Sequence, residues 1–143
     1  RIEGAEEFEM SDSTISGAPA VYIQESELRL TRVDLTGSGV GDGMTIHGTP
    51  SGGTIIDDCD IDDYETALRM TGDIDEATGT GVSILNSHLH APYSISSVNI
   101  PFNVEGGELD GTIYMDGLDK PWSANVMTMT ISKSRLLATQ HCM

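Results

Sequence analysis

Apolar and polar positions in this chain recur as a degenerate phrase of eight residues. Six copies occur, at 8–15, 28–35, 54–61, 82–89, 102–109 and 129–136. Positions one, three and eight are apolar in every copy except at Thr54, and position six is small, being Ser, Cys, Gly or Val. Self-similarity at intervals of tens of residues indicates a stacked architecture, in which each unit buries its apolar side against its neighbours.

A second short apolar segment follows the phrase in most units. Most of these segments alternate with period two and carry β-branched or aromatic residues, as strands do. They are 20–23, 44–46, 67–70, 93–95 and 112–115. Gly, Pro, Asp and Ser fill the intervals and mark turns. Residues 21–28 also fit the phrase, but they begin only 13 residues after Phe8. That interval is too short for a closed coil, so we assign 21–23 to the second strand of the first unit.

The last apolar residue of each phrase advances by 20, 26, 28, 20 and 27 residues. Variable steps with short strands predict an all-β fold, a right-handed parallel β-helix of about six coils. We expect residues 1–143 to form a single β-helix domain or a segment of a longer β-helix. A β-sandwich is the main alternative, because it also has many short strands and frequent turns. The sandwich gives no reason for the phrase to return.

Two phrases carry a resemblance to a known group of proteins. Residues 56–61 (IDDCDI) and 84–89 (ILNSHL) resemble the I-x-N-C/S-x-I coil repeat of pectate-lyase-like right-handed parallel β-helix proteins. The resemblance covers nearly the whole chain and implies the fold. It implies no single activity, because that superfold hosts lyases, hydrolases, epimerases, phage tailspikes and non-catalytic surface proteins. The Gly-His-Gly and Arg-x-Lys motifs of polygalacturonases are absent, so we transfer no catalytic residue.

The charge balance restricts the partners. The chain has 23 acidic and 7 basic residues, which gives a net charge of -16. Such a surface repels phosphate backbones and anionic lipid, so nucleic-acid binding is not expected. No run of 18 apolar residues occurs, and membrane insertion is not expected. The scarcity of Lys and the abundance of Thr, Ser, Gly and Asp favour an extracellular or cell-surface location.

Acidic residues gather where successive coils should stack. Like-numbered positions would form columns, and the outward seventh column reads Thr14, Asp34, Asp60, His88, Glu108, Arg135. The candidate metal ligands are Asp34, Asp57, Asp58, Asp60 and Asp62. Carboxylates about 5 Å apart repel one another, which raises a pKa or recruits a cation. The plainest interpretation is a solvated acidic turn. The alternatives are a calcium site and a sugar-hydrolysing pair on the face of Asp34, Asp57 and Asp60.

The cysteines, histidines and tryptophan do not indicate a specific functional site. Cys59 and Cys142 lie about three layers apart, or about 15 Å, which is too far for a disulfide. Cys59 is therefore predicted to be a buried free thiol. His88 and His90 alternate on one strand and share a face, but a zinc site needs a third ligand. We expect Trp122 to be buried against the side of the coil rather than exposed as a platform for sugars.

The open ends of a β-helix carry unpaired backbone groups that invite another chain. We expect a non-catalytic structural or adhesive surface module that self-associates through its coil ends into filaments or a coat. One alternative is a carbohydrate-active β-helix enzyme, a lyase or hydrolase acting on polysaccharide. Another is a calcium-stabilised adhesin. No cofactor other than calcium is expected.

Overall fold

A computed structural model describes residues 1–4, 7–48, 53–72, 81–116 and 129–136. Fourteen strands belong to one sheet system in these ranges. Every pairing between them is parallel, which confirms the β-helix and rules out the β-sandwich. In the part of the chain described, we find no helix long and apolar enough to cross a membrane.

The strands span from two to eleven residues. They are β1 (Ile2–Glu3), β2 (Phe8–Ser16), β3 (Val21–Gln24), β4 (Leu28–Thr36), β5 (Asp42–His47), β6 (Thr54–Asp57), β7 (Asp60–Asp62), β8 (Thr66–Thr71), β9 (Val82–Leu85), β10 (His88–Val98), β11 (Phe102–Glu105), β12 (Glu108–Asp116), β13 (Met129–Ser132) and β14 (Arg135–Leu136).

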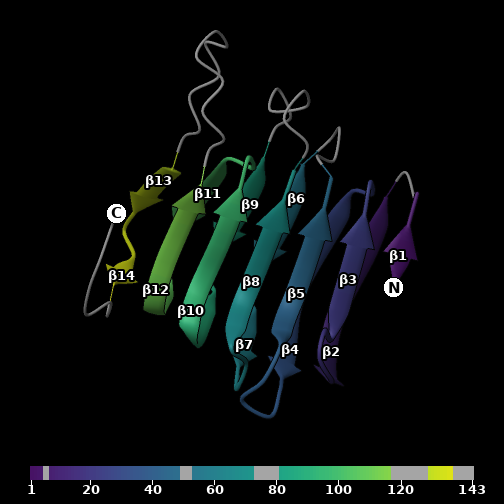
Figure 1. The fold of residues 1–143 in the computed structure, drawn as a ribbon, viewed down its shortest axis with the longest axis horizontal. Helices are drawn as coiled ribbons and strands as arrows, with labels where there is room; N and C mark the ends of the chain where they lie inside the picture. The colour runs from purple at the N-terminus through teal and green to yellow at the C-terminus, as the bar shows by residue number, and fades with distance from the viewer. Residues whose placement is uncertain (5–6, 49–52, 73–80, 117–128, 137–143) are drawn as a thin grey trace, which may run out of the picture.

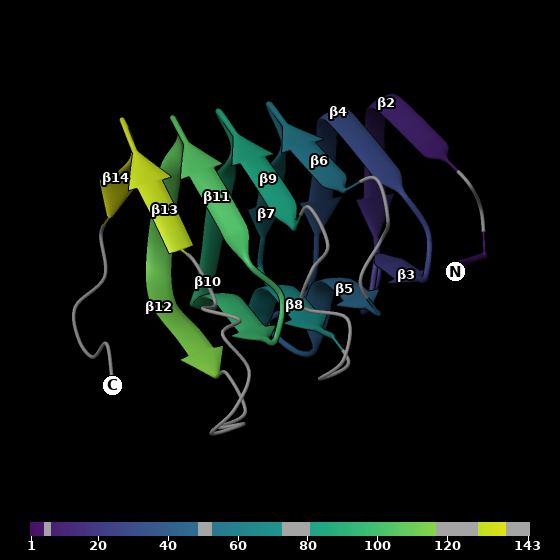
Figure 2. The same cartoon turned by 90° about the horizontal axis from the view of Figure 1, so that it is seen from above.

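These strands form three rows around the spiral. The first row holds phrase positions one to four, in β6, β9, β11, β13 and the first halves of β2 and β4. The second row holds the later phrase positions, in β7, β14, the second halves of β2 and β4, and the first parts of β10 and β12. The third row holds β1, β3, β5, β8 and the last parts of β10 and β12. Figure 1 shows the third row in front, and Figure 2 shows the first row on the opposite side.

The apolar columns run along the inside of the spiral. Position eight forms one unbroken line of paired residues, Ile15, Leu35, Ile61, Leu89, Leu109 and Leu136. The four inner members of this line are at most 1% exposed, whereas Leu136 at the C-terminal end is 50% exposed. The predicted inner row is therefore confirmed, and it is covered only where a neighbouring layer lies on both sides.

A left-handed residue makes the bend between the first and second rows. Position five has a positive φ in every phrase, between 49° and 72°, at Asp12, Arg32, Asp58, Asn86, Gly106 and Lys133. The next side chain secures most of these bends by donating to the carbonyl two residues earlier. Ser87 Oγ lies 2.7 Å from the Leu85 oxygen, and Cys59 Sγ lies 3.3 Å from the Asp57 oxygen. Small polar side chains at position six thus stabilise a backbone conformation that costs free energy for residues other than glycine.

The structure differs from the sequence prediction in three respects. The spiral makes fewer complete turns than the six coils predicted. Counting phrases counts strands of one row, and the phrase at 129–136 has no third-row strand among the described residues. In the fourth and fifth units the chain continues from the second row into the third without a break, so β10 and β12 are single long strands. The pairing between β10 and β12 has register shifts after His90. The sequence analysis also missed β1, which pairs with β3.

Thr54 is the one polar residue at an apolar phrase position, so its substitution by an apolar residue measures what a polar group costs in this core. Its side chain is 1% exposed, and its hydroxyl has no hydrogen-bond partner among the described residues. It lies in register between Leu28 and Val82. Because an unpaired buried hydroxyl costs about 1–3 kcal/mol, we expect Thr54→Val to raise the free energy of unfolding by about 1 kcal/mol. Urea denaturation checks this, and a loss of stability would contradict it.

Candidate functional site

Acidic and histidine side chains share the outward face of the second row. We call this set the acid–histidine face; it consists of Asp34, Asp60, Asp62, His88, His90, Glu108 and Asp110. The pairing register generates it, because Asp60 is paired with His88, and His88 with Glu108. Residues two apart on a strand point to the same side. Two histidines therefore lie between two rows of carboxylates.

The centre of this face is hollowed only slightly. A depression of about 210 Å³ is lined mainly by Asp60, Asp62, His88 and His90 with the carboxylates of β12. His90 Nδ1 lies 2.8 Å from Asp110 Oδ2. The face can hold cations or hydrogen-bond donors, but it does not enclose a small molecule as a buried pocket would.

The surroundings of Asp60 change its ionisation. Partial desolvation beside the neighbouring strands raises the pKa of Asp60 above the usual value of 3.8, and the charges of Asp62 and Asp34 raise it further. His88 and His90 act in the opposite direction. A carboxyl that holds its proton more firmly than a free aspartate does is a feature of both acid catalysts and crowded acidic surfaces.

Asp60→Asn should stabilise the chain at neutral pH. The native pKa of Asp60 is raised, so the ionised form costs stability above that pKa, and the cost disappears as pH falls below 3.8. Because Asp60 is exposed, we expect a gain of about 0.5 kcal/mol or less. The gain should vanish at about pH 2.5, well below the ordinary pKa, where native and unfolded Asp60 are both protonated. Urea denaturation at both pH values measures it, and a gain that grows in acid would contradict the assignment.

The five aspartates predicted as metal ligands do not gather at one point. Asp34 and Asp60 are register partners in the second row, and Asp62 follows on the same side of β7. Asp57 lies across the bend in β6, and Asp58 occupies the left-handed position of the bend itself.

Asp57 also has a protein partner, because its Oδ1 accepts a hydrogen bond from Asn86 Nδ2 at 3.1 Å. In the described ranges, no three His, Cys, Asp or Glu side chains are placed so that they could hold a metal ion. The calcium site stays a prediction for solution measurements.

Basic side chains are already engaged with carboxylates. Each of the six Lys and Arg in the described ranges lies in an ion pair: Arg1–Glu3, Arg29–Glu9, Arg32–Asp12, Arg69–Asp42, Lys133–Glu105 and Arg135–Glu108. Most of these pairs join adjacent layers. The acid–histidine face has one of these cations, Arg135 beside Glu108, at its C-terminal edge. The middle of the face is therefore negative whenever its histidines are neutral.

Cys59 is a buried free thiol, as predicted. Burial raises its pKa above the usual value, so the reactive thiolate is disfavoured. Cys142 and Trp122 lie outside the described residues, so the predictions for them stay untested.

The comparisons with known proteins do not assign the chain. No family model, no curated protein and no solved structure matches the sequence or the fold.

The sequence analysis found Asp34, Asp60 and Asp62 but missed the part played by Glu108 and Asp110. The signal was present in the seventh column, since His88 precedes Glu108 there. The column two residues further on pairs Asp62 with His90 and His90 with Asp110. It lies beyond the phrase, so the repeat alone does not predict it.

Proposed function

We propose that this chain is a non-catalytic structural or adhesive module of an extracellular or cell surface, which assembles end to end. The edges of the two outermost layers support this most directly. Within the described residues, β2 pairs only with β4, and β13 only with β11. Each therefore presents a row of backbone N–H and C=O groups, which is a template for a further parallel strand.

The sides of the solenoid support the same function. The acid–histidine face is shallow, and the cations of the described residues are engaged in ion pairs with the protein's own carboxylates. A large negative charge on such sides keeps them from packing on one another. Association through the ends then meets less repulsion than association through the sides.

Sedimentation velocity at several protein concentrations, with calcium and with a chelator, tests the proposal. We expect the mass to rise with concentration through a series of multiples of the monomer, and to do so in both solutions. Electron microscopy of the heaviest fraction should show threads of the width of one solenoid. A constant monomer mass at every concentration would exclude the proposal. Growth only with calcium would favour the calcium-stabilised adhesin.

The second candidate is a carbohydrate-active enzyme, and one observation favours it. Asp34 and Asp60 are register partners, and the pKa of Asp60 is raised. Adjacent strands are about 4.8 Å apart, which is close to the carboxyl spacing of about 5 Å in retaining glycosidases. The resemblance to pectate-lyase-like proteins suggests polysaccharide as the substrate. Turnover of a polysaccharide that is lost in Asp60→Asn would support this candidate over the first.

A further inference from the structure

We infer that copies of this chain stack head to tail in one continuous register, with the phrase 129–136 of one copy pairing with β2 of the next. This inference rests on the proposed end-to-end assembly and adds its polarity and register. The next copy's β1 then lies beside β12 and supplies a third-row strand to the joint. Three features of the described residues support this arrangement. They are the ends of the apolar columns, the two ends of charged column five, and the staggered strands of the third row.

The apolar columns end unfinished at both ends of the stack. Met10 and Ile15 at the N-terminal end, and Ile131 at the C-terminal end, are only partly buried against the core. Leu136 is 50% exposed. In the proposed register Ile131 lies on Met10 of the next copy, and Leu136 lies on Ile15. Each pair continues a column of the chain, so the joint repeats the packing found inside the solenoid.

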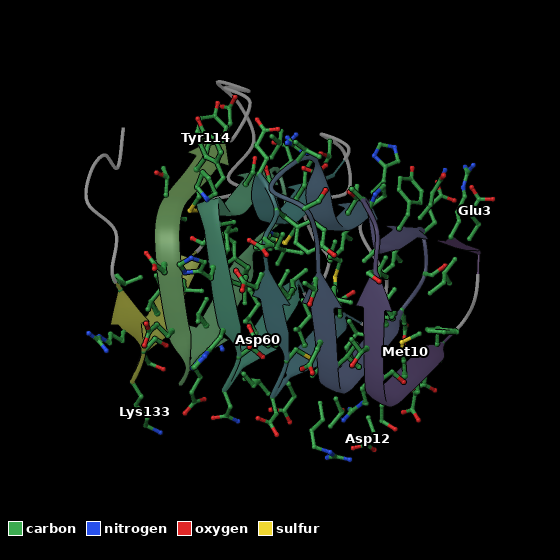
Figure 3. All side chains as sticks on the ribbon, turned by 90° about the horizontal axis from the view of Figure 1, so that it is seen from below. Glu3, Met10, Asp12, Asp60, Tyr114 and Lys133 are labelled. Carbon is green, nitrogen blue, oxygen red and sulfur yellow. The ribbon has the colours of Figure 1, made fainter. Side chains whose placement is uncertain are left out.

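Column five ends with opposite charges at its two ends. Asp12 ends column five at the N-terminal end and Lys133 ends it at the C-terminal end, with φ of 49° and 53°. Figure 3 places these two labelled residues at opposite ends of the molecule. An ion pair between adjacent layers of this column already exists inside the chain, because Arg32 Nε lies 2.6 Å from Asp12 Oδ1. Lys133 of one copy would approach Asp12 of the next from the other side.

The third row is staggered in a complementary way. At the N-terminal end it extends one strand beyond β2, because β1 pairs with β3. At the C-terminal end, no third-row strand accompanies β13 and β14 among the residues described. The overhang of β1 therefore fits beside β12 of the preceding copy, where the register continues from Ile23 through Ile46, Met70 and Ser97 to Met115.

Arg1 gives this joint an additional contact. Its guanidinium carbon lies 5.2 Å from the ring centroid of Tyr22. The column that contains Tyr22 ends at Tyr114, which is 45% exposed. Arg1 would therefore lie between two tyrosine rings, one from each copy, and cation–π contacts favour such a position. Figure 3 shows Tyr114 and Glu3, the neighbour of Ile2 in β1, at opposite ends of the same side.

One contact in the joint is unfavourable and makes the register testable. The column of Glu3 passes through Gln24, His47 and Thr71 and ends at Asp116. Glu3 would then lie beside Asp116 of the preceding copy, and like charges on paired strands repel. Glu3→Gln should therefore tighten the association, by about threefold in the dissociation concentration. A residue that only supports its own fold would not have this effect.

Charge reversal tests the polarity. Asp12→Lys and Lys133→Asp should each raise the dissociation concentration about tenfold, because each variant brings two like charges together at its joint. An equimolar mixture should assemble as well as the wild type, since each variant's C-terminal end then meets the complementary N-terminal end of the other. Asp58→Lys makes the same change in the same column away from the ends, and should leave assembly unchanged.

Cross-linking tests the register directly. Ser11 and Ser132 occupy position four of the first and last phrases, so the proposed register brings them into adjacent layers. Adjacent strands are about 4.8 Å apart, within the range of a disulfide. Ser11→Cys with Ser132→Cys, in a Cys142→Ser background, should give a ladder of oxidised oligomers on a non-reducing gel. Thr31→Cys with Ser132→Cys should not.

The outcomes separate the inference from the proposed function. A wild type that stays monomeric at every concentration overturns both. Assembly without rescue in the mixture, and without the cross-linked ladder, overturns the register but leaves end-to-end assembly standing. Rescue and a ladder together with hydrolysis or lyase activity would confirm the register and overturn the non-catalytic function.

Discussion

Gly107→Ala is expected to lower the free energy of unfolding by about 3 kcal/mol or more. Gly107 has a φ of +81°, and a Cβ added there would lie 2.2 Å from the Ser87 carbonyl oxygen. That oxygen accepts the backbone hydrogen bond of Glu108 at 3.1 Å. The three atoms nearest to this Cβ are all backbone atoms of Ser87, so no side chain can move aside and the layers themselves must separate. Thermal and urea denaturation of the variant measure the loss.

Gly39→Ala is the matched control for this change. Gly39 has the same φ of +81°, but an added Cβ would have no atom within 4 Å. The backbone conformation alone should cost about 1–2 kcal/mol. The difference between the two variants therefore isolates the close approach of two layers. Equal losses would show that the tight contact at the fifth bend does not limit stability.

Leu89→Ala is the second large effect, with an expected loss of about 2–5 kcal/mol. Leu89 is 0% exposed and lies in the inner column between Ile61 and Leu109. In a solenoid each layer packs mainly on its two neighbours. A cavity at Leu89 therefore weakens the contacts with both neighbouring layers. Urea denaturation should show a lower midpoint and a broader, less cooperative transition.

Leu136→Ala makes the same chemical change in the same column. Leu136 is 50% exposed, so its truncation at low protein concentration should cost less than about 1 kcal/mol. At high concentration the loss should grow if the chain assembles through this end. A loss at low concentration as large as that of Leu89→Ala would contradict the inner column as the main source of stability.

The fold could be predicted because one short pattern controls both burial and turning. Apolar residues at positions one, three and eight specify the inner columns, and the small residue at position six follows the bend. The pairing of Ile15, Leu35, Ile61, Leu89, Leu109 and Leu136 was therefore predictable from spacing alone. The number of turns could not be predicted, because the phrase covers the first two rows and does not specify the path through the third row that closes each coil.

The candidate site was predictable only where it coincided with the phrase. Asp34 and Asp60 share column seven, so stacking placed them together. Asp57 and Asp58 were grouped with them because they are close in sequence. However, Asp58 is itself the left-handed residue of the bend, and Asp57 lies on the other side of that bend from Asp60. The part of the acid–histidine face formed by Asp62, His90 and Asp110 depends on how far strands continue after the phrase, which the periodicity does not specify.

The six left-handed corners form a ridge along the outside of the solenoid, and the ridge has a fixed pitch. Its side chains are Asp, Arg, Asp, Asn, Gly and Lys, so the backbone geometry there accepts several chemistries. Parallel layers repeat about every 4.8 Å. Charges or reactive groups substituted along this ridge would therefore lie at regular intervals, without any change in the apolar interior.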